Sequence, residues 1–566
     1  MTEFLVVLAL AIALGWPLGH YLAAVMRGAP MRGDRVFGLV ERPLYRLLGV
    51  DPAQGMGWKA YASAFLLSNL VLGVLVWIIF MTQAWLPLNP DGAPNMRWDL
   101  ALHTMVSFLT NTDQQHYSGQ AQLSYLAQMT GIVGLQVVTP MMGLALVAAT
   151  LRGLFGGRRP QHEPAGDGPA DLGNYWADVI RPAVRVFLPL GLVLALLLAG
   201  QGVPSTLQGG PVATPIDATA GMKEQKIPLG PVAAMVAVKQ LGTNGGGWYG
   251  PNSAVPLENP TPLSNLLETL ALILLPVAVA FMVGAFTGRK KFTALVFGSM
   301  LAMSLVSTGL ALWSEGHSAT AADIALMEGK EVRFGADASA LWAALTTQTS
   351  NGSVNAMHDS LAPLTGLVTM GNMLVNAIWG GIGCGLQQFL VYLLLSVFLA
   401  GLMTGRTPEL FGRKIEAPEV KLLAVLVLLQ PLVLLGMTAV TLAVPAITGN
   451  SNPGFHGISQ VFYEYTSAFA NNGSGFEGLG DATYWWNLSC AAVLALGRYP
   501  ALILPLVIAA MLAHKRVAPE GPGTLHVETP TFALTLIAVV VILTLLQFMP
   551  VLVLGPVADH LALTAR

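Results

Sequence analysis

Residues 242–247 read Gly-Thr-Asn-Gly-Gly-Gly, and altered copies of the Thr-Asn-Gly core occur at three other places in this 566-residue chain. Each copy places a polar residue and an Asn before a Gly, except the first copy, which has Thr there. Glycine accepts a positive φ without steric cost, so such a string can turn successive backbone carbonyls toward one axis. Four such loops would form a ring of carbonyl oxygens, which cation-selective filters use to replace a hydration shell. The predicted filter residues are Thr110, Asn111 and Thr112, Thr243, Asn244 and Gly245, Ser350, Asn351 and Gly352, and Asn471, Asn472 and Gly473.

Each string lies at the same place in a repeated pattern of hydrophobic segments. A short apolar segment, which is too brief to span a bilayer, runs directly into each string. These segments are 98–109, 230–241, 338–349 and 458–470. Long segments flank them, and a membrane-spanning helix needs about 20 apolar residues. The ten candidate spans are 2–26, 60–84, 124–150, 180–200, 266–287, 291–313, an interrupted 364–403, 420–447, 486–512 and 532–555.

This pattern predicts an all-α polytopic membrane protein with ten transmembrane helices. Four helix–pore loop–helix repeats with pseudo-fourfold symmetry lie between one leading and one trailing helix. The predicted boundaries are 1–59 for the N-terminal helix and cytoplasmic loop, 60–155 for repeat 1, 156–179 for a cytoplasmic loop, 180–288 for repeat 2, 289–405 for repeat 3, 406–419 for a cytoplasmic loop, 420–516 for repeat 4 and 517–566 for the C-terminal helix.

Composition supports a membrane protein. The chain is 54% hydrophobic and 10% charged, whereas soluble domains carry about a quarter charged residues. The net charge of −2 favours no charged partner, and no nucleic-acid partner is expected. Cys384 and Cys490 both lie in apolar segments, and we interpret them as small buried hydrophobes, with no disulfide or bound metal assigned.

Basic residues predict the orientation. Lys and Arg concentrate in every second connection, as expected for cytoplasmic loops. The marked connections contain Arg27, Arg32, Arg35, Arg42, Arg46 and Lys59; Arg152, Arg158 and Arg159; Arg289, Lys290 and Lys291; Arg406, Arg413, Lys414 and Lys421; and Lys515 and Arg516. Lys223, Lys226, Lys239, Lys330 and Arg333 are exceptions. The pattern places the N-terminus and the pore loops outside, which in a bacterium is the periplasmic side of the inner membrane, and it predicts a flexible cytoplasmic loop at 156–170.

The residue types in the strings favour a monovalent cation. Backbone carbonyls bind as fixed dipoles without net charge, and the C-terminal ends of the short helices add partial negative charge at the axis. Asp113 is the only acidic residue beside a string. We expect the Asn side chains to brace the loops as much as to bind the ion. Gln115 is predicted either to brace or to line the filter entrance.

Two features are candidates for a gate or pore block beneath the filter. Gly380, Gly381, Gly383 and Gly385 interrupt the span at 364–403, and such an interruption is tolerated only against protein or a water-filled cavity. Close helix packing is the alternative reading. Arg498 lies well inside a span, where an Arg usually faces a pore or a partner, and snorkelling to a headgroup is the alternative.

ATP-hydrolysis motifs are missing from the sequence. The chain contains no G-x-x-x-x-G-K-[ST] string and no Asp-Lys-Thr-Gly-Thr string. It therefore has no recognisable catalytic ATPase site, and active transport would draw its energy from a partner or an ion gradient. An intramembrane enzyme would need clustered catalytic groups, and the spans contain no HExxH, GxSxG or paired-Asp motif.

Six stretches carry a resemblance to a known family. They are SFLTNTDQQHYSG (107–119), GTNGGGWYGPNSAVPLENPTP (242–262), TSNGSVNAMHDSLAPLTG (349–366), GGIGCGL (380–386), GLMTGRTPELFGRKIEAPE (401–419) and SAFANNGSGFEGL (467–479). They resemble the KdpA family, the potassium-binding subunits of bacterial Kdp P-type ATPases, within the superfamily of K⁺ transporters. Trp248, Tyr249 and Gly250 depart from the Phe-Phe-Asn more often found in that family, at the outer entrance.

This resemblance implies a subunit that selects K⁺ from the periplasm through its filter. It implies assembly in the lipid bilayer with a catalytic ATPase subunit (KdpB-like), a single-span accessory subunit (KdpC-like) and often a small membrane peptide (KdpF-like). The ion would pass from below the filter through an intersubunit tunnel, and Arg498 and the glycines at 380–385 would block the vertical route. The alternative is a stand-alone, gradient-driven K⁺ or Na⁺ channel-like transporter of the same superfamily.

Overall fold

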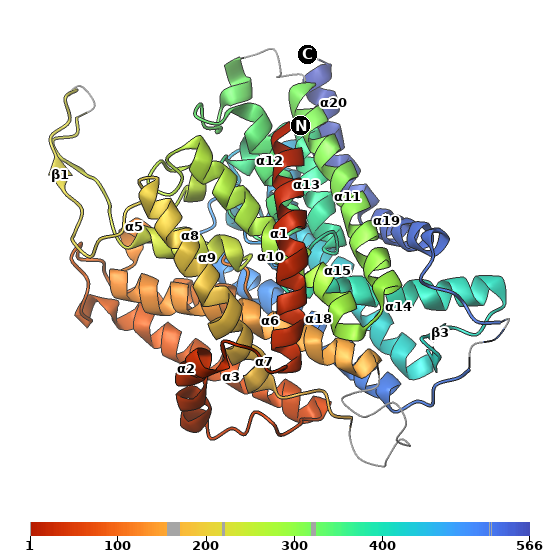
Figure 1. Ribbon diagram of the computed structural model, residues 1–566. Coiled ribbons are helices and arrows are strands. Elements are labelled where there is room, and N and C mark those ends of the chain that lie inside the picture. The colour runs from red at the N-terminus through yellow and green to blue at the C-terminus, as the bar shows by residue number, and fades with distance from the viewer. Residues whose placement is uncertain are drawn as a thin grey trace.

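The computed structural model describes residues 2–155, 170–217, 221–318, 324–519, 521 and 523–565 (Figure 1). The loop predicted at 156–170 therefore lies outside the described residues, apart from its last residue. In the described part, ten helices are long and apolar enough to cross a membrane. The predicted all-α architecture is confirmed, and the strands within these described residues are two short pairs, β1 (Val212–Ala213) with β2 (Gln225–Lys226) and β3 (Glu409–Leu410) with β4 (Arg413–Lys414).

The long helices follow the predicted spans closely. Several of them continue through π-helical turns, at Ala127–Ile132 before α6, at Ala183–Phe187 between α7 and α8, and at Val553–Val557 between α19 and α20. The spanning elements are α1 (Thr2–Arg27), α3 (Trp58–Thr82), α6 (Val133–Leu154), α7 (Tyr175–Pro182) with α8 (Leu188–Gly200), α10 (Pro262–Thr287), α11 (Lys290–Gly316), α14 (Cys384–Thr404), α15 (Ala417–Ala443), α18 (Tyr484–Ala513), and α19 (Pro530–Leu552) with α20 (Ala558–Thr564). Short helices in the connections are α2 (Asp34–Leu48), α5 (Gly119–Gln122) and α16 (Pro445–Thr448).

Four half-length helices enter the molecule between these spans. They are α4 (Trp98–Leu109), α9 (Val232–Leu241), α12 (Gly335–Gln348) and α17 (Phe455–Phe469), and each ends directly before one of the polar strings. The predicted order of one leading helix, four helix–pore loop–helix repeats and one trailing helix is confirmed. The start of α1 and the end of α20 lie at the same end of the molecule, as an even number of spans requires (Figure 1).

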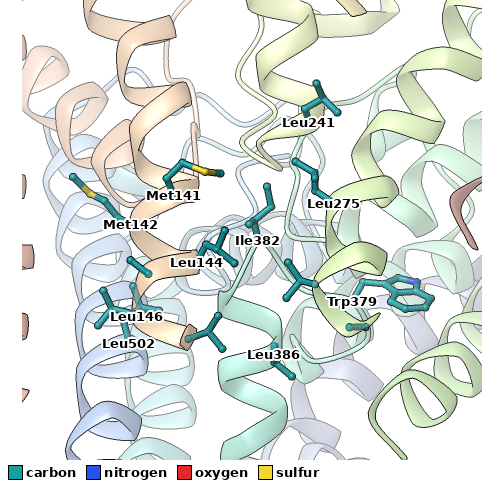
Figure 2. Close-up of a cluster of buried hydrophobic side chains, with 14 of the residues drawn as sticks. Met141, Met142, Leu144, Leu146, Leu241, Leu275, Trp379, Ile382, Leu386 and Leu502 are labelled. Carbon is teal, nitrogen blue, oxygen red and sulfur yellow. The ribbon is translucent and has the colours of Figure 1, made fainter. Parts of the chain in front are cut away.

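The second helix of the third repeat is broken into two pieces. The predicted interrupted span is two helices, α13 (Pro363–Val375) and α14, separated by residues 376–383. α13 ends at Asn376, whose left-handed φ of 46° cannot continue a helix. Figure 2 shows Ile382 of this break between Leu144 of α6 and Leu275 of α10, so apolar packing holds the non-helical segment in place.

Burial separates the inner helices from the outer ones. α6 and α10 are mostly buried by other parts of the chain, whereas α15 is mostly exposed. The leading helix α1 packs along α10 (Figure 1), and a Cβ added to Gly19 would lie 2.5 Å from the Ala278 carbonyl oxygen. A small residue at that position lets the two backbones approach closely.

Candidate functional site

The four strings turn away from their pore helices in the same way. In each repeat one pore-helix carbonyl accepts a hydrogen bond from the amide five residues further on. The four bonds are Thr112 N to Ser107 O (3.0 Å), Asn244 N to Lys239 O (3.1 Å), Asn351 N to Thr346 O (3.0 Å) and Asn472 N to Ser467 O (2.9 Å). These amides define equivalent positions in the four loops.

This equivalence shifts the first string by one residue. Thr112 takes the place of Asn244, so Asp113 takes the place of Gly245. The φ angles agree, since Asn111 (60°) and Asp113 (57°) are left-handed in repeat 1, as Thr243 (50°) and Gly245 (81°) are in repeat 2. The sequence alignment of Thr112 with the glycines is therefore wrong by one residue. The residue that replaces Gly in the first repeat is Asp113.

The loops contact one another around a closed ring. A Cβ added to Gly245 would lie 2.1 Å from the Asn351 carbonyl oxygen, and one on Gly352 would lie 1.9 Å from that of Asn472. A Cβ on Gly473 would lie 1.9 Å from the Thr112 carbonyl oxygen. The glycines are required for these approaches as well as for their positive φ.

The contact between repeats 1 and 2 closes the ring. Asn111 Nδ2 donates to the Thr243 carbonyl at 3.1 Å, and Asn244 Nδ2 donates to Asn111 Oδ1 at 2.6 Å. A Cβ on Gly246 would lie 2.7 Å from the Cβ of Asp113, so Asp113 faces the next repeat as the three glycines do. The four loops that carry the predicted filter residues are therefore brought together, with Asn111, Thr112 and Asp113 at the three equivalent positions of the first loop and Thr110 one residue before them.

The Asn side chains brace the ring from behind. Asn351 Nδ2 donates to the Lys239 carbonyl at 3.1 Å, and Asn472 Nδ2 donates to the Thr346 carbonyl at 2.9 Å. Each amide thereby ties its own loop to the end of the preceding pore helix. Asn471 Nδ2 links repeat 4 to repeat 1 through Thr112 Oγ1 at 3.0 Å. These amides fix the loops, which leaves the backbone carbonyls as the groups available to a cation.

Gln115 joins the first two loops at the entrance. Its Nε2 donates to the Gly247 carbonyl at 3.0 Å, and its Oε1 accepts from the Gly247 amide at 2.8 Å. Gln115 also lines a cavity of about 90 Å³ together with Gly352, Gly473 and Asp481. Gln115 thus contacts the second loop and also borders this cavity, and its role at a filter entrance stays a prediction.

A buried polar network behind the second loop has no counterpart among the sequence predictions. Lys239 and Glu258 form an ion pair with no exposed side-chain surface. Lys239 Nζ also donates to Asn252 Oδ1 at 2.5 Å, and Asn252 Nδ2 donates to the Gly245 carbonyl at 2.6 Å. Lys239 is therefore a structural support of the second loop, which explains why it departs from the predicted distribution of basic residues.

Asp113 places a carboxyl group behind the ring. Its Oδ2 accepts a hydrogen bond from Gln136 Nε2 of α6 at 2.8 Å, and only 2% of the residue is exposed. Gln136 Nε2 also donates to the Gly246 carbonyl at 2.9 Å. The carboxyl group is thus held at the junction of the first two loops, and the ring has three glycines and one acidic residue at equivalent positions.

The glycine-rich break lies directly beneath the ring. The Ile382 amide donates to Thr243 Oγ1 at 3.1 Å, and a Cβ on Gly381 would lie 3.3 Å from the same oxygen. Gly380 (φ 59°) and Gly383 (φ 84°) are left-handed. A Cβ on Gly385 would lie 2.2 Å from the Gly380 Cα, so the break is a tight turn closed on itself.

Arg498 reaches the same region from α18. Its Nη1 donates to Cys384 Sγ at 2.5 Å and its Nη2 donates to the Thr139 carbonyl at 3.3 Å, with 3% of the residue exposed. Arg498 therefore faces the interior and does not extend toward a headgroup. It lines a cavity of about 20 Å³ with Asn111, Ser350 and Asn471.

A second cavity continues sideways from the first. It measures about 30 Å³ and shares Asn376, Gln388, Gly497 and Ala501 with the cavity beneath the ring. Its remaining lining residues are Leu426, Leu429, Gln430, Phe469 and Leu496. The first three belong to α15, of which little is buried, so the space beneath the ring extends toward an outer helix of the chain.

Comparisons with known proteins agree over nearly the whole chain. The profile of the KdpA family, described as the potassium-transporting ATPase A subunit, matches residues 5–561. A potassium-transporting ATPase potassium-binding subunit from Gloeobacter violaceus is 45% identical over 99% of this chain and 98% of its own length. The protein of the same name from Pseudomonas putida is 44% identical over 96% of each chain. Among solved structures, the potassium transporter TrkH from Vibrio parahaemolyticus aligns with 88% of this chain and 98% of its own at 15% identity, with a TM-score of 0.48.

Proposed function

Because the chain belongs to the KdpA family of potassium-transporting ATPase A subunits, we propose that it selects K⁺ for an ATP-driven uptake pump. It is a membrane protein of potassium transport without a recognisable ATPase motif of its own. In this proposal the four loops are the selectivity filter, and the ion then passes to a P-type ATPase partner. Potassium is the transported substrate.

The closed ring of loops is the observation that carries the proposal. Carbonyl dipoles from four loops around one axis can replace the hydration shell of a monovalent cation without adding net charge. The glycines at equivalent positions permit loop contacts that no other residue type could make, because a Cβ on Gly352 or Gly473 would overlap a neighbouring carbonyl oxygen. The backbone is thereby fixed by contacts between repeats.

The space beneath the ring supports a lateral route. The glycine-rich turn at 380–385 and Arg498 stand below the filter, where a positive charge opposes a direct passage for cations. The adjoining cavity leads to α15 instead. We therefore assign Gly380, Gly381, Gly383, Gly385 and Arg498 to blocking the vertical path, which prevents dissipation of the gradient, and we assign the sideways cavity to ion transfer.

Partners and location follow from the same proposal. The relatives are named as subunits of a potassium-transporting ATPase, so we expect a catalytic P-type subunit, with a single-span accessory subunit and a small membrane peptide. The exposed, apolar α15 is the surface nearest the lateral cavity and suits contact with the catalytic subunit. The distribution of basic residues supports the bacterial inner membrane with a periplasmic N-terminus.

The decisive experiment is K⁺-stimulated ATPase activity of the affinity-purified native complex, with wild type beside Gly245→Asp. Gly371→Ala is the matched control, because Gly371 lies in α13 and a Cβ there meets no atom within 4 Å. We expect an ATPase subunit to co-purify and only Gly245→Asp to lose K⁺ affinity or selectivity. A chain that purifies alone and conducts K⁺ down its gradient in liposomes would instead be a stand-alone channel-like transporter.

A further inference from the structure

Three buried side chains that the filter does not use converge beside its first and fourth loops. His116 follows the first string, Glu464 belongs to the pore helix α17, and Cys490 belongs to α18. One potential ligand atom from each of the three lies within 4.8 Å of the other two. We refer to these residues as the His–Glu–Cys cluster. A nitrogen, a carboxylate oxygen and a sulfur at this spacing form the mixed donor set that Zn²⁺ binds in proteins.

The imidazole of His116 is already oriented as a metal ligand. Asn487 Nδ2 donates to Asp99 Oδ2 at 2.8 Å, which identifies the other amide atom, Oδ1, as the acceptor for His116 Nδ1 at 2.8 Å. His116 Nδ1 therefore carries a hydrogen, and in the neutral imidazole the lone pair lies on Nε2, which faces the cluster. Nε2 is fully buried and has no hydrogen-bond partner among the described residues. Metal-binding histidines are usually held by such an outer partner.

His116 Nε2 and the Glu464 carboxylate lie at the spacing of two ligands of one ion rather than at hydrogen-bond distance. His116 Nε2 lies 3.6 Å from Glu464 Oε1, while two ligands of one tetrahedral ion with bonds of about 2.1 Å lie about 3.4 Å apart. Glu464 is itself fixed, since its Oε2 accepts from the Phe476 amide at 3.1 Å. An ion between His116 Nε2 and Glu464 Oε1 would bind to both atoms, which are too far apart to form a hydrogen bond with each other.

Asp481 offers both a fourth ligand and an entrance. Its Oδ2 lies 4.0 Å from His116 Nε2, and 29% of its side chain is exposed. Asp481 and Glu464 also line the 90 Å³ cavity at the filter entrance. An ion from that side can reach the cluster past Asp481 without crossing the apolar core.

We propose that His116, Glu464 and Cys490, with Asp481, form a Zn²⁺ site beside the filter. Binding releases the thiol proton of Cys490 to solvent, so one thiolate and two carboxylates bind the ion, and the loaded site carries one negative charge fewer than the empty site. Gln114 Nε2 donates to Glu464 Oε1, so the site is one hydrogen bond away from the residue that follows Asp113. Because the loaded site is more positive than the empty one by one unit, zinc binding weakens the attraction of this region for K⁺ in the ring. This last consequence rests on the proposed filter, whereas the binding of zinc does not.

Zinc content of the purified full-length chain, measured after incubation with Zn²⁺ and desalting, tests the site. Wild type is expected to retain one ion per chain, and Cys490→Ser and His116→Asn to retain none. Cys384→Ser is the thiol control and should keep its ion, because Cys384 contacts Arg498 instead. Asn487→Ala keeps all ligands and is expected to weaken binding about 10- to 100-fold through the loss of the outer partner. Thermal unfolding without zinc checks that each variant is folded.

Cobalt substitution gives a second readout of the ligands. A thiolate-to-cobalt charge-transfer band in wild type, absent in Cys490→Ser, supports the sulfur ligand. Equal zinc retention in all variants means an adventitious ion only, and absence of zinc from folded wild type also overturns the proposal. If zinc binds as expected but leaves K⁺ stimulation unchanged, the site stands and its coupling to the filter is refuted.

Discussion

Replacing Gly352 with Ala perturbs the ring at one defined contact. Gly352 has a φ of 90°, a region in which a residue with a Cβ is strained by about 1–3 kcal/mol. The new Cβ would also lie 1.9 Å from the Asn472 carbonyl oxygen, whereas close C···O contacts are about 3.3 Å. The fourth loop must therefore retreat by more than about 1 Å, and overpacking of this kind typically costs about 1–3 kcal/mol.

The expected result is a weaker K⁺ site in a protein that still folds. Strain and overlap together amount to about 2–6 kcal/mol. Moving the Asn472 carbonyl away from the axis loses coordination, and about 1.4 kcal/mol lost from the bound state already means a tenfold weaker affinity. We therefore expect the K⁺ concentration for half-maximal stimulation to rise at least about tenfold.

Two assays check this prediction. K⁺-stimulated ATPase activity reports on the assembled pump, and K⁺-dependent thermal stabilisation of the purified chain reports on binding alone, because a ligand that binds only the folded state raises its stability. Gly371→Ala serves again as the control, since a Cβ there meets no atom within 4 Å. A folded Gly352→Ala protein with K⁺ affinity within twofold of wild type would refute the reasoning.

Three further predictions concern charges around the ring. Arg498→Ala should admit a passive K⁺ leak into liposomes, because the variant removes the buried cation beneath the filter; a flux equal to wild type would contradict the assigned block. Lys239→Met leaves Glu258 buried without its partner, which should cost about 3–5 kcal/mol of unfolding free energy and lower the unfolding temperature. Adding Glu258→Gln to this variant should restore part of the unfolding temperature, and no recovery would argue against the ion pair as the cause. Burial lowers the pKa of His456, but hydrogen bonds, the first of them to Asp359, outweigh burial and raise that pKa to about 9. Stability from this raised pKa is complete below the ordinary value of about 6.5 and is lost as the pH rises through about 9, so the difference in unfolding temperature between wild type and His456→Gln should shrink from pH 6 to pH 10.

The helices were predictable because the length and composition of apolar segments decide what can cross a bilayer. Segment 98–109 coincides with α4 (Trp98–Leu109), and the position of the break near Gly380 follows from the glycines. The pairing of Lys239 with Glu258 was not predictable, because it depends on a loop that folds back over the end of α9. The sequence therefore identifies Lys239 as an exception to the distribution of basic residues but does not explain it.

The register of the first string could not be predicted from the sequence either. Thr110-Asn111-Thr112 matches Thr243-Asn244-Gly245 by residue type, and the offset becomes visible in the bond from Thr112 N to Ser107 O and in the left-handed φ angles of Asn111 and Asp113. Asn111 can adopt the left-handed conformation that the turn requires, which makes the shifted register sterically acceptable. The contacts around the ring, unlike the helices, depend on atoms from repeats far apart in the chain.

The placement of all four loops on one polypeptide has a genetic consequence. In an assembly of four identical subunits, one codon change alters every quarter of the pore at once. Here a single codon alters one quarter only. The first loop is such a case, since it has Asp113 at the position where the other three loops have Gly. In the proposed filter, a substitution can therefore change one quarter while it leaves the sequence of the other three unaltered. Mutational scans should accordingly find graded changes in ion preference. The same substitution introduced in turn at Asp113, Gly245, Gly352 and Gly473 should give four variants that differ in K⁺ affinity.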